Sequence, residues 1–124
     1  MELEDRIVRF AARCVKACAA LPAKAVGSAS FADQLFRSST GIAANYAEAC
    51  EAESAKDFVH KLKIAMKELS ETRIWLRLIG ASGYVEEAKL FDLIAESREL
   101  SRILSASVTT AKKKIGSQNG NGWH

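Results

Sequence analysis

The sequence predicts an all-α fold, an antiparallel up-and-down bundle of four helices, and three observations support this prediction. Apolar residues recur every third or fourth position through four segments, which is the spacing of one buried face on a helix. Short stretches with Gly, Pro or Ser separate these segments, and no segment shows the alternation typical of a strand. With 124 residues, the chain is long enough for one hydrophobic core and too short for two. Amphipathic helices joined by short loops pack most simply as a bundle.

The first helix is expected over residues 3–21, before Pro22 and Gly27 end it. Its apolar stripe steps by four and three positions and consists of Leu3, Ile7, Phe10, Cys14, Ala17 and Leu21. The second helix is expected to begin at Ser30, because Asp33 follows three residues later in the pattern of a capping box. Its buried face consists of Phe31, Leu35, Ile42, Tyr46 and Ala49.

The third helix is expected over residues 54–80. Ser54 and Asp57 form a second capping signal directly before a long apolar series. This series holds its spacing for three heptads and consists of Phe58, Leu62, Ala65, Leu69, Thr72, Leu76 and Ile79. Gly80 and Gly83 are expected to stop the helix.

The fourth helix is expected over residues 85–114. Its stripe consists of Leu90, Ile94, Ser97, Ser101, Leu104, Val108, Ala111 and Ile115. The final stretch, KKKIGSQNGNGWH, joins three adjacent lysines to Gly and Asn residues that do not sustain a helix. The sequence therefore predicts a bundle domain over residues 1–115 and a flexible tail over residues 116–124.

More apolar residues are present on the last two helices than one stripe needs. Those outside the main stripes are Val59, Met66, Ile74, Trp75, Leu78, Phe91, Leu93, Leu100 and Ile103. A second apolar face on a helix indicates contact with another subunit, so we expect a homo-oligomer. The alternative is a wider core stripe within one chain.

Composition narrows the class of protein. No apolar run approaches the roughly 20 residues of a membrane-spanning helix, and the N-terminus MELEDRIVRF lacks the pattern of a signal peptide. The three cysteines have no metal-site spacing and fit a reducing compartment, with Cys14 and Cys18 as small core residues. We therefore expect a cytoplasmic protein that makes no membrane contact.

The sequence offers no catalytic or metal-binding constellation. A dimetal bundle site needs two copies of Glu-x-x-His, and the nearest match runs from Asp57 to His60. Nucleophilic catalysis needs a base beside a Ser or Cys, and His60 is the one histidine before the terminal His124. We expect no enzyme activity, no catalytic residues, no metal and no cofactor.

Basic residues form two stripes that could follow a phosphate backbone. The first, on the first helix, consists of Arg6, Arg9, Arg13 and Lys16, and the second, on the third helix, consists of Lys56, His60, Lys63 and Lys67. A net charge of +3 is mild for a nucleic-acid binder, but several copies in a ring would multiply it. The alternative is an ordinary solvated face.

Polar residues interrupt the apolar pattern of the second and third helices. They are Arg37, Asn45, Glu48, Lys61, Glu68, Glu71 and Thr72, and Trp75 joins them as an interface candidate. A charged group at a packed interface must be paired, because leaving it alone costs several kcal/mol. We expect these residues to fix the register between helices or subunits. The alternative is surface pairs within one helix, such as Lys67 with Glu71.

Three stretches of the sequence carry a family resemblance. They are residues 38–49 (SSTGIAANYAEA), 53–58 (ESAKDF) and 68–76 (ELSETRIWL), and Gly83, Tyr84 and Val85 agree as well. The chain resembles, over about residues 5–110, the small proteins encoded in intervening sequences of bacterial 23S ribosomal RNA genes. The resemblance implies an antiparallel four-helix bundle that assembles into a ring-like homopentamer.

Two positions depart from the pattern of this family. Ala44 stands where many relatives carry Pro, and Ala49 stands where many carry Gly. Without the proline, the second helix is expected to run straighter.

Two functions are open from the sequence. The first is a non-catalytic oligomeric module that binds nucleic acid, in particular structured RNA, through basic stripes repeated around a ring. A related group, accessory proteins of diversity-generating retroelements, forms similar pentameric barrels that bind nucleic acid and a reverse transcriptase. The second is a scaffold or accessory subunit that binds a protein partner and no nucleic acid.

Overall fold

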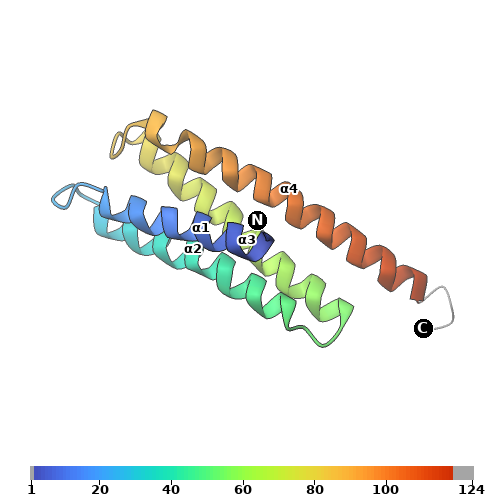
Figure 1. The fold of residues 1–124 in the computed structure, drawn as a ribbon. Coiled ribbons are helices and arrows are strands. Elements are labelled where there is room, and N and C mark those ends of the chain that lie inside the picture. The colour runs from blue at the N-terminus through green and yellow to red at the C-terminus, as the bar shows by residue number, and fades with distance from the viewer. Residues whose placement is uncertain (1, 119–124) are drawn as a thin grey trace.

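The computed structural model describes residues 2–118, which form four α-helices and no strand (Figure 1). The helices are α1 (Leu3–Ala19), α2 (Ser28–Cys50), α3 (Ala55–Ala81) and α4 (Glu87–Gln118). Each helix packs against its neighbours in the chain, and α4 returns to contact α1. The predicted all-α, four-helix architecture is confirmed.

The core lies between the four helices and is built mainly from the predicted stripes. Its largest fully buried side chains include Phe10, Ile7, Leu35, Ile42, Leu62, Leu69, Leu76 and Leu104. Cys14 is fully buried among them, as expected, and the three cysteines of the chain are free. Val59, Leu93 and Leu100, which we assigned outside the stripes, are at most 8% exposed and belong to this core. The wider-core alternative is therefore correct for these three residues.

The helices differ in length. Because α1 is the shortest, one half of the bundle contains only α2, α3 and α4. At a rise of about 1.5 Å per residue, α1 with 17 residues is roughly 26 Å long and α4 with 32 residues is roughly 48 Å long. The first turns of α1 lie beside the middle of α4, since Arg6 contacts Glu96. The C-terminal half of α4 continues past the N-terminal end of α1 (Figure 1).

The start of α3 follows its local sequence signal, whereas the start of α2 departs from the predicted one. The Ser54 hydroxyl accepts a hydrogen bond of 3.0 Å from the backbone N–H of Asp57, which confirms the cap of α3. The expected start at Ser30 is wrong, because α2 begins at Ser28 after Gly27. Gly27 has a φ of 86°, a left-handed conformation that favours glycine, and its carbonyl accepts from Phe31.

The end of α3 shows different roles for its two glycines. Gly83 has a φ of 79°, and hydrogen bonds from Gly83 N–H to the Gly80 carbonyl and from Tyr84 N–H to the Ile79 carbonyl close the last turn. This is the arrangement of a Schellman motif, so the stop at Gly83 is confirmed. Gly80 lies within the helix instead. A Cβ atom there would approach Glu87 Cγ to 3.2 Å, so its absence lets α4 pack closely against α3.

The fourth helix extends further than expected. Helix α4 continues through the three lysines to Gln118, and Ile115 packs partly buried against the core. Residues 116–118 of the predicted flexible tail are therefore helical. Residues 119–124 of that tail lie outside the described part of the chain.

The two loops at one end of the bundle are tied together. The Tyr84 hydroxyl donates a hydrogen bond to the Val26 carbonyl, which joins the α3–α4 loop to the α1–α2 loop. The Tyr84 ring also packs edge-to-face on Phe31 with 5.1 Å between ring centroids, and Trp75 packs on Phe31 at 6.2 Å. This aromatic cluster fixes the end of the bundle where α3 passes into α4.

Candidate nucleic-acid interface

The basic stripe predicted on α1 is partly engaged in helix packing. Arg6 donates two hydrogen bonds to Glu96 of α4, at 2.7 and 2.8 Å, and these bonds raise the pKa of the guanidinium. Arg9, Arg13 and Lys16 are exposed. Glu96 lines the same hollow as Arg9 and Arg13, so a carboxylate lies within this stripe. Arg6 thus holds α1 against α4, and the stripe offers less free positive charge than its sequence suggests.

The basic stripe predicted on α3 is exposed and meets a lysine of α4. Lys56, Lys63 and Lys67 are exposed, as is His60. Lys63 lies beside Lys112 of α4, and its positive charge lowers the pKa of Lys112. The two helices therefore bring positive charges together at this point.

A second basic cluster lies further along the same pair of helices. Arg73 donates hydrogen bonds to the hydroxyls of Ser97 and Ser101, at 3.3 and 3.2 Å. The Ser97 hydroxyl itself donates to the Ile94 carbonyl at 2.6 Å, so its lone pairs are free to accept from Arg73. Burial lowers the pKa of Arg73, and the nearby Arg98 lowers it further. Neutral hydroxyls thus position this guanidinium and leave its charge uncancelled.

The arginines of this cluster lack acidic partners. Within residues 2–118, none of the salt bridges involves Arg73, Arg77 or Arg98. The sequence explains this, because the residues three and four positions away from each of them on the same helix are never Asp or Glu. Glu87 lines the same hollow as Arg77 and Arg98 but forms no salt bridge with either, so the three arginines leave this cluster with a net positive charge.

Antiparallel packing aligns the two positive regions on one side of the α3–α4 pair. Lys63 and Arg77 are fourteen residues apart on α3, as are Arg98 and Lys112 on α4, and fourteen residues make almost four full turns. We call Lys63, Arg73, Arg77, Arg98 and Lys112 the α3/α4 basic face. It extends for about 21 Å along the helices, which matches roughly six phosphate steps along one strand of a duplex.

The polar residues predicted between α2 and α3 lie along that seam. Arg37 lies 3.8 Å from Glu71, and Lys61 lies 3.7 Å from Glu48. Each pair joins α2 to α3, whereas the Asn45 amide donates to the Gly41 carbonyl within α2. The two ion pairs join neighbouring helices, and none of these contacts involves a residue of the α3/α4 basic face.

Two residues of the polar set have no partner in the described part of the chain. Glu68 Oε2 is buried without a hydrogen bond, and burial together with the nearby Glu71 raises the pKa of this carboxyl. The Trp75 indole N–H is also buried and unpaired, while its ring packs on Phe31. A Cβ atom at Gly41 would approach Glu68 Oε2 to 3.0 Å, so the glycine makes room for this carboxylate.

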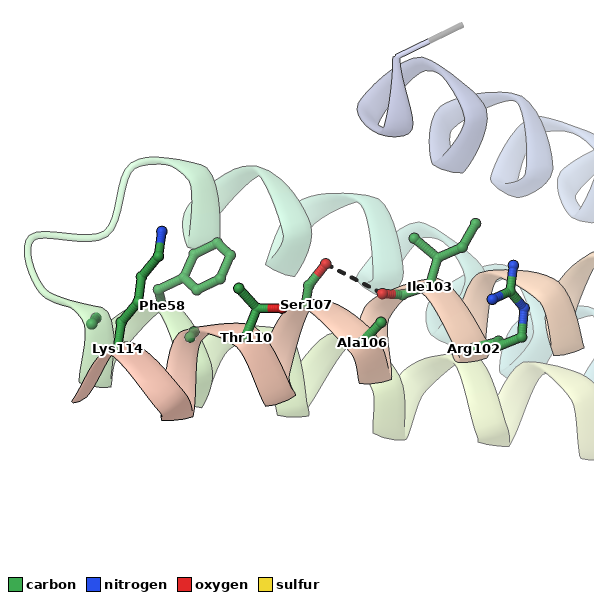
Figure 2. Close-up of a pocket in the computed structure, with 9 residues that line it drawn as sticks. Phe58, Arg102, Ile103, Ala106, Ser107, Thr110 and Lys114 are labelled. Atoms are coloured by element: carbon green, nitrogen blue, oxygen red, sulfur yellow. Dashed lines mark hydrogen bonds between the residues drawn. The ribbon is translucent and has the colours of Figure 1, made fainter. Parts of the chain in front are cut away.

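One hollow among the described residues is a groove with a mainly apolar lining. It measures about 590 Å³ and lies beside the C-terminal half of α4, beyond the end of α1 (Figure 2). Phe58 and Ile103 line it, and Arg102 and Lys114 lie at its edges. The Ser107 hydroxyl donates to the Ile103 carbonyl at 3.2 Å, as in an ordinary helix. We call this hollow the α4 groove.

Residues 2–118 contain no group of three or more His, Cys, Asp and Glu side chains arranged to hold a metal ion. None of the four helices combines the length and the hydrophobicity that crossing a membrane requires.

The α3/α4 basic face is the feature that sequence reasoning missed. Basic stripes that follow single helices leave out Arg73, Arg77 and Arg98. Arg73 and Arg77, one turn apart without acidic neighbours, were the available signal. The partner helix could be added only from the register of the folded bundle.

Comparisons with known proteins agree with the fold. A family model described as "23S rRNA-intervening sequence protein" matches residues 2–106. A crystal structure of a protein with unknown function from the S23 ribosomal protein family of Bacteroides thetaiotaomicron is 32% identical and superposes with a TM-score of 0.78. The match covers 86% of this chain and 98% of that chain. A search of curated proteins found no match.

Proposed function

Since the chain belongs to the family of 23S rRNA-intervening sequence proteins, we propose that it is a non-catalytic, homo-oligomeric module that binds structured RNA through its basic faces. The observation that carries this proposal is the α3/α4 basic face, whose arginines have no acidic partner among the described residues. Unpaired arginines suit phosphate, because the planar guanidinium donates two parallel hydrogen bonds to its oxygens.

Assembly strengthens the electrostatic argument. One chain has a net charge of only +3, which is weak for a polyanion binder. In a ring of identical copies, such as the homopentamer that the family resemblance implies, the α3/α4 basic face is repeated around the assembly. A structured RNA that contacts several copies gains affinity from each of them. The exposed stripe of Arg9, Arg13 and Lys16 and the lysines Lys56 and Lys67 extend the positive surface.

Exposed apolar residues on α3 support self-association. Ile74 is 47% exposed and Leu78 is 42% exposed, one turn apart, and shallow hollows adjoin both side chains. We call these two residues the α3 apolar patch. Neighbouring apolar side chains of this size favour contact with another surface, and a second copy of the chain is the partner that we propose.

The experiment that tests RNA binding is a titration at several salt concentrations. Fluorescence anisotropy with a labelled RNA hairpin measures the dissociation constant between about 50 and 200 mM salt. If about three to five phosphates are contacted, affinity falls by roughly 40- to 500-fold over this range. Binding that does not change with salt, or no binding at any concentration, would exclude the proposal.

A second candidate function, a protein scaffold without RNA binding, is favoured by the α4 groove. This groove of about 590 Å³ lies where α1 does not reach, so a helix of another protein could occupy the open position in the bundle. The scaffold hypothesis predicts no RNA retention at low salt. It also predicts that Ala106→Trp, which fills the groove, prevents capture of the partner protein.

A further inference from the structure

A smaller hollow lies at the end of the bundle where α3 passes into α4, beside the α3/α4 basic face. It measures about 320 Å³, and its lining includes Leu76 and Leu90 as well as Arg77, Glu87, Phe91 and Arg98. Leu76 is fully buried and Leu90 is 3% exposed, so both form a firm apolar floor. A hollow of this size, with an apolar floor and charged edges, can accept a flat aromatic group such as one nucleobase.

Phe91 is the unusual residue at the edge of this hollow. Phe91 is 62% exposed, compared with 51% for Phe36, and the other three phenylalanines are buried or half-buried. The core does not need this ring, because Leu90 of the same helix belongs to the core and Ile94 packs against it. An exposed phenyl ring beside arginines is typical of proteins that stack unpaired bases and hold the strand by its phosphates.

Arg77 and Arg98 reach the hollow from opposite helices. Both are exposed, and neither forms a salt bridge within residues 2–118. Arg73 lies one turn away and adds positive charge on the same side. Phosphates on either side of a base that enters the hollow would therefore meet guanidinium groups.

Glu87 decides what enters the hollow. Glu87 lines the cavity. A carboxylate repels a phosphate group, while it can accept hydrogen bonds from the N–H groups on the edge of a base. Guanine, adenine and cytosine carry an exocyclic amino group that can donate such a bond. Uracil has only its ring N3–H, which lies between two carbonyl oxygens that repel a carboxylate. The residues therefore favour an amino-bearing base in the hollow and phosphates outside it.

We propose that this hollow holds one unpaired, amino-bearing base of the bound RNA, stacked on Phe91, with the flanking phosphates on Arg77 and Arg98. The inference rests on the proposed RNA binding and adds the class of RNA that is recognised. A fully paired duplex keeps its base faces stacked inside the helix, so it cannot use Phe91. Hairpin loops, bulges and single-stranded ends can.

The test compares two RNAs of equal length and charge, a hairpin with an unpaired loop and a fully paired duplex. Binding is measured for the wild-type protein and for Phe91→Ala, Phe91→Tyr and Val8→Ala. Val8 is a matched control, since it is 51% exposed on α1. We expect Phe91→Ala to weaken hairpin binding about tenfold and to leave duplex binding unchanged. Phe91→Tyr, which keeps the stacking surface, and Val8→Ala should bind like wild type.

A fluorescent base reports the stacking itself. With 2-aminopurine in the loop, the wild-type protein should change the fluorescence, and Phe91→Ala should abolish that change. Glu87→Gln should reduce the preference for an amino-bearing base over uracil at the same position. Hairpin binding that is unaffected by Phe91→Ala would overturn the inference while RNA binding itself stands. A wild-type protein that binds neither RNA would instead overturn the proposed function.

Discussion

Arg73 of α3 donates a hydrogen bond of 3.2 Å to the Ser101 hydroxyl of α4. A serine in this place anchors the guanidinium without neutralising it, which a carboxylate would do. The same helix pair therefore gains a cross-helix contact and retains a positive charge at its surface. This combination distinguishes Arg73 from Arg6, whose charge is paired with Glu96.

Arg73→Met tests whether this retained charge serves binding. The methionine keeps an apolar stem and removes the charge, so we expect RNA affinity to fall and the slope of affinity against salt to decrease by about one. The unfolding free energy should fall by about 1.5–3 kcal/mol, because the hydrogen bonds to Ser97 and Ser101 come from a charged donor. Anisotropy titrations and chemical denaturation measure the two effects. An unchanged salt slope would show that Arg73 does not contact phosphate.

Thr72→Val tests a buried hydrogen bond between α3 and α2. Thr72 and Ser38 are both fully buried, and their hydroxyl oxygens are 2.8 Å apart. The valine keeps the shape and leaves Ser38 without this partner, so we expect a loss of about 1–2 kcal/mol in unfolding free energy. In the double variant with Ser38→Ala, part of this loss should be recovered. Additive losses in denaturation experiments would mean that the two hydroxyls do not interact.

Glu68→Gln tests the effect of a half-buried carboxyl on stability. Burial raises the pKa of Glu68 in the folded protein, so the folded state holds this proton more tightly than the unfolded state. Stability from this group is therefore fully present below the unfolded pKa and is lost as the pH rises through the folded pKa. Glu68→Gln should remove this loss and be at least as stable as wild type at pH 7. The control is Glu53→Gln, at an exposed position.

Denaturation curves between pH 4 and pH 8 measure this difference. The curve of stability against pH should be flatter for Glu68→Gln than for wild type, and Glu53→Gln should follow wild type. A Glu68→Gln protein that is less stable than wild type at pH 7 would show that the carboxylate has a favourable partner, for example in a neighbouring subunit.

Light scattering tests the proposed assembly. The wild-type protein should have a mass several times the 13.5 kDa of one chain, and five times that mass for the pentamer. A charge within the α3 apolar patch, Ile74→Glu or Leu78→Glu, should shift the protein to smaller species because the charge would be buried without a partner. Val26→Glu is the control, since Val26 is 91% exposed in a loop. A monomeric wild type at micromolar concentration would contradict self-association.

The fold was predictable wherever a short sequence signal determines the local structure. The capping pair of Ser54 and Asp57 and the left-handed Gly83 both lie where the sequence indicates. The start of α2 was not predictable in the same way, because Gly27 supplies a backbone conformation and no side-chain cap. Ser30 and Asp33 resemble a capping pair in the sequence, but both lie within α2.

The core and the candidate site were harder to predict, because both depend on neighbouring helices. A single stripe describes a helix with one neighbour, whereas α3 and α4 each contact two, so Leu93 and Leu100 are buried although they lie outside the predicted stripes. Arg6 forms a hydrogen bond with Glu96, which is ninety residues away in the sequence, and no local sequence pattern predicts that pair. The α3/α4 basic face likewise combines two helices whose register is set only in the folded bundle.

The most direct test of the central claim compares charge reversal within and outside the α3/α4 basic face. The first variant carries Arg77→Glu with Arg98→Glu, and its matched control carries Lys24→Glu with Lys89→Glu, two exposed lysines outside the basic faces. Affinity for a labelled RNA hairpin is measured for both, after circular dichroism has shown equal helix content. We predict that the first variant binds at least about tenfold more weakly than the control and has a salt slope lower by about two. Equal binding by the two variants would contradict the assignment of RNA binding to the α3/α4 basic face.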